Sequence, residues 1–304
     1  MRSLASFIMR GRWQAALVAA LATVLSLLLP PILIFGAASV ALATLRWGSR
    51  EGALVILISA CAIFILTLPL FGSGSIQLAL IVALLFWLPS WFLALALRTT
   101  ISLALTLAVA AAFGALAVLA FYAVLYDPAS WWTETLNAQL KPMFDSAGLI
   151  KDEAAFNDFV KFLALIMPGI IAASFLANIL LGLLLARWWQ ALLYNPGGFR
   201  KEFHALRLGQ RMALATVIVS GLALIIGLPL FINLLWVLGA IYVIQSFALV
   251  HGLVFKAGLA RGWLIGFYVL MTFAPQLLSF LCLLSVIDAW VDFRSRIKPA
   301  PGRN

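Results

Sequence analysis

The sequence predicts an all-α, polytopic transmembrane helical bundle, from its composition and from the length of its apolar blocks. Of its 304 residues, 65% are hydrophobic and 10% are charged. Soluble domains carry about 25% charged residues, and a water-soluble fold cannot bury this much apolar surface. Because a spanning helix needs about 20 apolar residues, the charge-free blocks mark the candidate spans: 13–45, 52–97, 99–126, 162–186, 212–255 and 262–287.

Several of these blocks are too long for one span and are expected to divide at turn residues. The segment 72–75 divides 52–97, and the segment 227–229 divides 212–255. Pro30 and Pro31 interrupt 13–45, where a proline pair ends or sharply kinks a helix. Basic residues flank this block on both sides, so the positive-inside rule favours a hairpin with a short second arm. Pro275 lies near the middle of 262–290, which we therefore also expect to fold back as a hairpin.

The basic residues follow the positive-inside rule if both hairpins form. All but Lys141, Lys151 and Lys161 of the 20 lysines and arginines then lie in the cytoplasm, as does the N-terminus. This tally places Arg261, Lys298 and Arg303 inside. We therefore expect a single integral membrane domain over 1–304 with about ten membrane segments, eight or nine being the alternatives.

The outer, periplasmic loop 127–158 holds six of the ten acidic residues. Asp127-Pro128 can start a helix, after which Trp131, Trp132 and Leu136 fall at helical spacing. Such an amphipathic helix would lie on the membrane surface with its tryptophans at headgroup level. We interpret it as a lid that closes the bundle; the alternative is a gate over a binding site.

Catalytic chemistry is not apparent in the predicted membrane cores. They contain no HExxH, GxSxG, paired aspartates or GxxxxGK[ST] loop, which argues against a protease or a self-powered ATPase. We therefore expect no enzyme, cofactor or metal, with a lipid-modifying enzyme as a third alternative. Cys61 and Cys282 lie in apolar blocks and are interpreted as packing residues. No Lys/Arg-rich domain is present to bind nucleic acid.

The apolar blocks do contain neutral polar residues, which in lipid must find hydrogen-bond partners. Two interpretations stay open: bonds that hold helices together, or a small polar pocket for a neutral or amphipathic ligand. The second predicts a cavity under the 127–158 loop with at least two of these side chains on its wall. The tentative substrate-binding residues are Gln245, Ser246, His251, Asn178 and Asn233.

The cytoplasmic basic loop 187–211 joins two predicted spans through a turn at 195–198, where glycines permit positive φ. It is interpreted as an interfacial anchor for anionic lipid headgroups, or alternatively as a docking or phosphate-contacting loop. The residues singled out here are Arg187, Asn195, Gly197, Gly198, Arg200 and Lys201.

This loop and the segment 288–294 (DAWVDFR) resemble the YybS-like family of bacterial inner-membrane proteins, a family of unknown function. The start of the chain is similar to the S components of energy-coupling-factor transporters: Ala16-xxx-Ala20, a short second arm, then 46–52 leading into the third segment. The resemblance implies a bacterial inner-membrane location and a role for Ala16 and Ala20 in contacting another membrane subunit.

The expected function is therefore that of a transporter-like, substrate-binding bundle for a small or amphipathic solute. The alternative is a non-catalytic membrane interaction or assembly factor. The lipid bilayer is the expected partner in either case, together with other membrane subunits.

Overall fold

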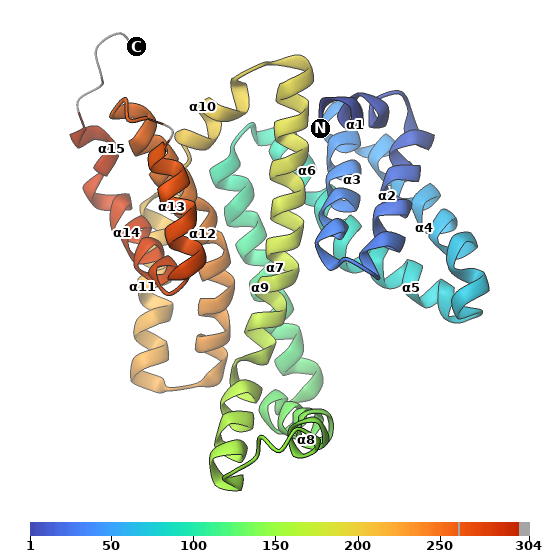
Figure 1. Cartoon of the computed structure of the whole chain (residues 1–304). Helices are drawn as coiled ribbons and strands as arrows, with labels where there is room; N and C mark the ends of the chain where they lie inside the picture. The colour runs from blue at the N-terminus through green and yellow to red at the C-terminus, as the bar shows by residue number, and fades with distance from the viewer. Residues whose placement is uncertain (261, 298–304) are drawn as a thin grey trace.

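A computed structural model describes residues 1–260 and 262–297, which fold into helices joined by short turns (Figure 1). The first half contains α1 (Arg2–Ile8), α2 (Arg12–Ser26), the 3-10 turn η1 (Pro30–Ile32), α3 (Leu33–Trp47), α4 (Ser49–Phe71), α5 (Gly74–Val82), the π-helical turn η2 (Ala83–Trp87), α6 (Leu88–Thr100) and α7 (Leu103–Leu125). The second half contains α8 (Pro128–Ser146), α9 (Glu153–Tyr194), α10 (Gly198–His204), α11 (Gly209–Ile226), α12 (Pro229–Lys256), α13 (Gly262–Phe273), α14 (Leu277–Val291) and α15 (Phe293–Arg296).

Among the described residues, seven helices are long and apolar enough to cross a membrane. They are Pro30–Trp47, Ser49–Phe71, Gly74–Thr100, Leu103–Leu125, Glu153–Tyr194, Gly209–Ile226 and Pro229–Lys256. The chain is thus an all-helical, multi-pass membrane protein. Three shorter apolar helices, α2, α13 and α14, would bring the number of segments to the expected ten, which remains a prediction.

The chain turns at both positions where a hairpin is expected. The chain turns between α2 and η1, and α2 packs against α3 and α4. A second turn, around Pro275, separates α13 from α14. The divisions predicted at 72–75 and 227–229 are also present, with Gly72 at φ 53° and Gly227 at φ 69°. Glycine has no Cβ, so it accepts these left-handed turns at no steric cost.

The centre of the bundle is formed by α9, which packs against α3 on one side and against α7 and α12 on the other (Figure 1). Gly182 lets the first pair approach closely, since a Cβ there would lie 2.7 Å from the Cβ of Ala37. The 42 residues of α9 span about 63 Å at 1.5 Å per residue, roughly twice the hydrocarbon core. The helix therefore extends beyond the bilayer.

The expected helix in the 127–158 loop is α8, which lies at one end of the bundle (Figure 1). The Asp127 carboxylate accepts hydrogen bonds from the Ser130 backbone N–H and hydroxyl, which caps the helix and lowers the pKa of Asp127. Its Leu136 is buried with Phe156 and Val160 of α9. The apolar stripe of α8 thus packs on the first turns of α9, which the spacing alone did not predict.

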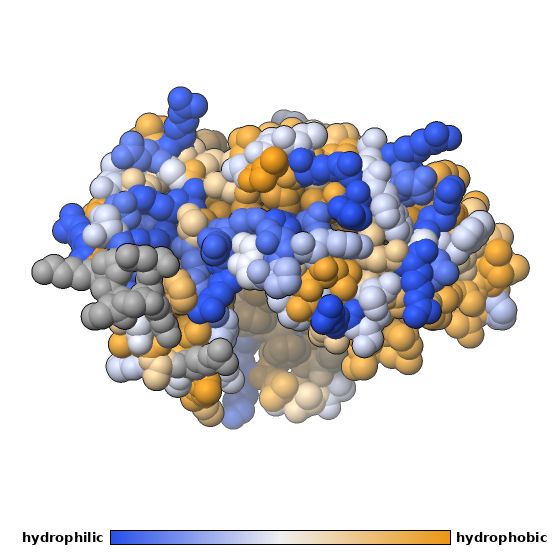
Figure 2. Space-filling model, turned by 90° about the horizontal axis from the view of Figure 1, so that it is seen from above, coloured by the Kyte–Doolittle hydropathy of each residue, from blue (hydrophilic) through white to orange (hydrophobic). Residues whose placement is uncertain are grey.

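The other end carries α1, α10 and α15 (Figure 1). These three helices contain Arg2, Arg200, Lys201, Arg294 and Arg296, and we call this the basic end. Space-filling shows hydrophilic residues scattered over this whole face (Figure 2). Its orientation toward the cytoplasm remains a prediction, and Arg261, Lys298 and Arg303 of the charge tally lie outside the described residues.

Candidate functional site

The polar residues of α12 hold helices together. Gln245 is 1% exposed; its Oε1 accepts from the Leu208 backbone N–H at 2.9 Å, and its Nε2 donates to the Ser285 carbonyl at 2.8 Å. Ser246 donates to the Tyr242 carbonyl and shares a hydrogen bond of 2.9 Å with the Ser285 hydroxyl. These contacts favour the interhelical interpretation for both residues.

Asn233 is fully buried and is bonded in the same manner. Its Nδ2 donates to the Leu165 and Pro229 carbonyls, each at 2.9 Å, and to the Tyr122 hydroxyl at 3.0 Å. The Oδ1 of Asn178, by contrast, is buried without a hydrogen-bond partner. Neither asparagine lines the three cavities described below. The contacts of Asn233 favour the interhelical interpretation, and a substrate-binding role for Asn178 stays a prediction.

A cavity of about 350 Å³ lies at the basic end, where α9 turns into α10. The turn depends on Gly197, whose φ of 87° suits a residue without a Cβ. The walls of the cavity combine aromatic rings with basic groups. They include two residues predicted from the basic loop, Gly197 and Arg200, together with His251. The complete lining is Trp188, Ala191, Leu192, Pro196, Gly197, Phe199, Arg200, Phe203, His204, His251 and Tyr268. We call it the basic-end pocket.

His251 is the one predicted polar residue on its wall, and it lies there with a partner. Its Nε2 is 2.8 Å from the Tyr268 hydroxyl of α13, and its ring centroid is 6.2 Å from that of His204. Burial lowers the pKa of His204 to about 4, assisted by the positive charges of Arg200, His251 and Arg294. The His204 imidazole is therefore neutral near pH 7.

Of the remaining residues predicted from the loop, Arg187, Asn195 and Gly198 have structural roles, whereas Lys201 has no side-chain hydrogen bond or ion pair among the described residues. Arg187 forms an ion pair with Glu202, in which its Nε lies 2.9 Å from Oε2. Asn195 ends α9, and its side chain lies so close to Gly198 that a Cβ there would be 2.4 Å from Nδ2. Lys201 is exposed on α10.

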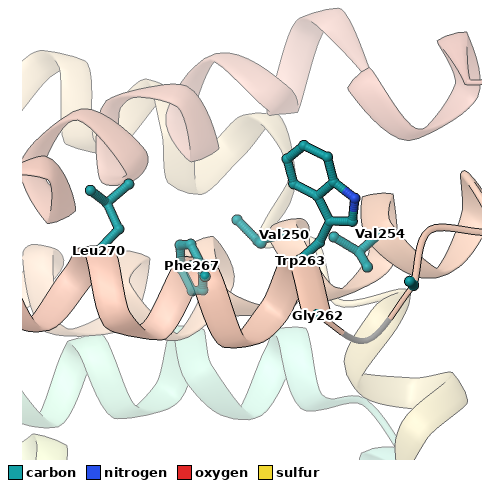
Figure 3. Close-up of a pocket in the computed structure, with 8 residues that line it drawn as sticks. Val250, Val254, Gly262, Trp263, Phe267 and Leu270 are labelled. Carbon is teal, nitrogen blue, oxygen red and sulfur yellow. The ribbon is translucent and has the colours of Figure 1, made fainter.

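The cavities gather around the hairpin of α13 and α14. One, of about 600 Å³, lies between α12 and α13 and is walled by Val250, Trp263 and Phe267 among others (Figure 3). Another, of about 830 Å³, is a groove walled by α9, α11, α12 and α14. No described residue of α13 is buried. Helix α13 thus covers α12 loosely, whereas α14 is bonded to it through Ser285. Since α8 contributes nothing to these three walls, the cavity expected beneath the 127–158 loop stays a prediction.

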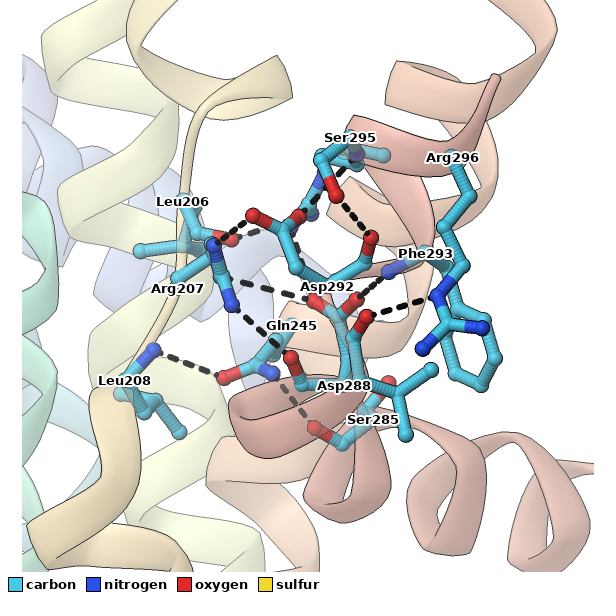
Figure 4. Close-up of polar contacts among 12 residues, drawn as sticks. Leu206, Arg207, Leu208, Gln245, Ser285, Asp288, Asp292, Phe293, Ser295 and Arg296 are labelled. Carbon is cyan, nitrogen blue, oxygen red and sulfur yellow. Dashed lines mark hydrogen bonds and ion pairs between the residues drawn. The ribbon is translucent and has the colours of Figure 1, made fainter.

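A charged cluster fastens the hairpin at the basic end (Figure 4). Asp288 is fully buried; its Oδ2 lies 3.0 Å from Arg294 Nη1, and its Oδ1 accepts from the Phe293 backbone N–H at 2.8 Å. Arg207, from the segment before α11, donates to the Asp288 carbonyl at 2.9 Å and pairs with Asp292 at 2.8 Å. The search for catalytic and polar residues in the sequence did not predict this cluster. The available signal was Asp288, a carboxylate directly after the last apolar block.

Ala16 and Ala20, the predicted partner contacts, are 1% and 0% exposed. The Ala16 carbonyl even accepts a hydrogen bond from the Ser59 hydroxyl of α4, at 3.3 Å. The small side chains therefore serve close packing inside this chain. The face of α2 that points outward carries larger residues, Leu17 and Leu21 among them.

The helices and the cavities together define the class: a multi-pass helical membrane protein with an apolar groove and a basic pocket beside its central helix, α9. Comparison with protein-family models, with curated proteins and with solved structures gives no match for this chain. Among the described residues, no three His, Cys, Asp or Glu side chains lie close enough together to hold a metal ion.

Proposed function

We propose that the protein is a transporter-like membrane bundle that binds a small amphipathic solute in the groove between α9, α11, α12 and α14. The observation that carries the proposal is the groove itself, whose volume of about 830 Å³ falls within the range of small-molecule sites. Its wall is apolar, with the hydroxyls of Ser174, Ser220 and Ser279 as polar points. Such a lining suits a solute that is mostly apolar.

The loosely packed helix α13 supports a role in taking up and releasing a solute. Pro275, in the turn between α13 and α14, lines the groove, so a displacement of α13 and this turn would change the width of the groove. Elements with few buried contacts are the ones that open at low free-energy cost, and no described residue of α13 is buried. The contacts of Ser285 and the charged cluster around Asp288 would hold α14 in place while α13 moves.

The test fills the groove. Gly239 lines it, and a Cβ at this position would meet no atom within 4 Å, so Gly239→Leu adds bulk in open space. Gly221→Leu on α11 is the matched control, because that glycine also faces open space but is not on the groove wall. We expect native mass spectrometry of the detergent-purified protein, incubated with a monoacylglycerol, to show one bound amphiphile, lost in Gly239→Leu and kept in Gly221→Leu. Equal retention in the two variants would contradict the proposal.

The alternative function, a membrane interaction or assembly factor, can be tested with the same detergent-purified protein. One side of α11 packs against α12 and α14, but Leu214, Val217 and Ile218 are each about half exposed, so the other side is free to contact lipid or another subunit. Stable co-purification of a membrane subunit, without a bound amphiphile, would favour this alternative.

A further inference from the structure

The basic-end pocket has positive charge that no carboxylate compensates. Glu202, the acid on α10, is already engaged by Arg187. Asp288 and Asp292 are engaged by Arg207 and Arg294. Within 1–260 and 262–297, no acidic side chain lies within ion-pair distance of Arg200 or Lys201. The charges of this pocket are therefore complementary to an anion.

Arg200 is held in a way that leaves its hydrogen-bonding edge free. Its guanidinium lies over the Phe255 ring, 4.3 Å from the centroid. Stacking occupies the flat face of a guanidinium, whereas its N–H groups lie in the plane and match the oxygens of a phosphate. The Tyr268 hydroxyl and the imidazoles of His204 and His251 line the same pocket and add polar atoms to its wall.

The lining of the pocket is typical of a site at the level of the lipid headgroups. Trp188 and Tyr268 are on its wall, and amphipathic aromatic residues are concentrated at the membrane–water interface. Apolar rings of Phe199 and Phe203 stack on each other at 5.6 Å beside the basic group. A free anion would gain nothing from these rings, whereas the glycerol and first methylenes of a lipid would.

The basic-end pocket and the apolar groove are on one face of α9. Ile170 of the groove and Trp188 of the pocket are separated by about five turns at 3.6 residues per turn, so they point in the same direction. Leu181 and Leu184 occupy the same face between them, and Leu181 is 47% exposed. The rise from Ala177 to Trp188 is about 16 Å, which an acyl chain can follow.

We propose that the basic-end pocket binds the phosphate headgroup of a membrane lipid whose acyl chain runs along α9 into the groove. The inference rests on the proposed function and deepens it, because it names the solute as an anionic phospholipid. Arg200 is the principal phosphate contact, and Lys201 adds long-range attraction from the exposed side of α10.

The experiment compares two amphiphiles with the same acyl chain, lysophosphatidate and a monoacylglycerol, titrated against the full chain in a neutral detergent. Native mass spectrometry gives the bound fraction of each. We expect the phosphate lipid to bind at least tenfold more tightly, and Arg200→Gln to abolish that preference. Arg200→Lys, which keeps the charge and loses the fork of N–H groups, is expected to restore part of it. Arg50→Gln, at an exposed arginine of the same end, is the control and is expected to change nothing.

The outcomes separate the two proposals. Equal binding of both amphiphiles, unaffected by Arg200→Gln but lost in Gly239→Leu, would overturn the headgroup assignment and leave the groove as an amphiphile site. If both Arg200→Gln and Gly239→Leu keep full binding of the lipid, both proposals are overturned. Full displacement of the lipid by inorganic phosphate at equal concentration would show that the pocket recognises a free anion, and would also overturn the assignment. Unchanged thermal melting of Arg200→Gln would exclude misfolding as the cause of lost binding.

Discussion

Asn233 of α12 inserts its side-chain amide into the backbone of α9 beside Pro168. Its Oδ1 accepts from the Gly169 N–H at 2.6 Å, while its Nδ2 donates to the Leu165 carbonyl at 2.9 Å. These two backbone groups are four residues apart and would pair with each other in an uninterrupted α-helix. One buried amide therefore joins the two longest helices of the bundle.

This relationship predicts that Gly169→Ala destabilises the protein. A Cβ at position 169 would lie 2.7 Å from the backbone of Asn233, so the two helices would have to separate. Asn233→Leu is expected to cost about 1–3 kcal/mol, because it leaves buried backbone groups without a partner. Thermal melting in detergent measures both effects. Gly221→Ala, in open space on α11, is the matched control, and equal melting of the two glycine variants would contradict the account.

Asp288→Asn is expected to destabilise the basic end strongly. The carboxylate is fully buried and Arg294 is only 12% exposed, so the substitution leaves a buried guanidinium without its charge partner. Removing one member of a buried pair typically costs about 3–5 kcal/mol. Hydrogen exchange should show α14 and α15 opening first. Asp158→Asn removes an exposed pair with Lys161 and is expected to leave the melting temperature unchanged.

His204 is expected to titrate at about 4, well below the usual 6.5 of an imidazole, chiefly because of burial and then because of Arg200, His251 and Arg294. Since the folded pKa is the lower one, the unfolded chain binds the proton more tightly, and stability falls as the pH drops from about 6.5 to about 4. The chain has 2 histidines, so ring NMR signals can be assigned with a His251→Gln variant. Arg200→Gln is expected to raise the pKa of His204; a value unaffected by this change would rule out the charge contribution.

Replacing Ala16 and Ala20 together by leucine is expected to unfold the N-terminal hairpin. Both side chains are buried against α3 and α4, and overpacking a filled interior typically costs about 1–3 kcal/mol per site. Yield of monodisperse protein and thermal melting are the measurements. Ala215→Leu, at an exposed alanine of α11, serves as the control. A folded double variant that has lost a partner subunit would instead support the similarity to S components.

Site-directed labelling tests the orientation. Cysteines at Ser73 and Ala138 are expected to react with an impermeant reagent from the periplasm, because the positive-inside rule places their loops outside. Cysteines at Ser49 and Lys201 are expected to react only after permeabilisation. All four positions are exposed, and Cys61 and Cys282 would first be replaced by alanine. Labelling of Ser49 from outside would show that α2 and α3 do not both cross the membrane.

The sequence by itself determined the class of protein and the positions of several turns. A long charge-free block indicates a membrane span by its length alone. Proline and glycine influence the backbone only near their own position, so turns at Pro30-Pro31, Gly72 and Gly227 are predictable without knowledge of the fold. The start of α8 at Asp127-Pro128 was predictable for the same reason, since helix capping is local.

Only the tertiary structure decided what the polar residues do. Gln245 and Asn233 could serve a pocket or a helix contact, and the choice depends on the Leu208, Ser285 and Gly169 backbone groups that other helices bring within hydrogen-bond distance. The pairing of Asp288 with Arg294 and Arg207 and the inward direction of Ala16 likewise depend on which helix faces meet. Hydropathy fixes the depth of a residue in the membrane, but the packing of helices fixes its neighbours, and the neighbours decide the chemistry.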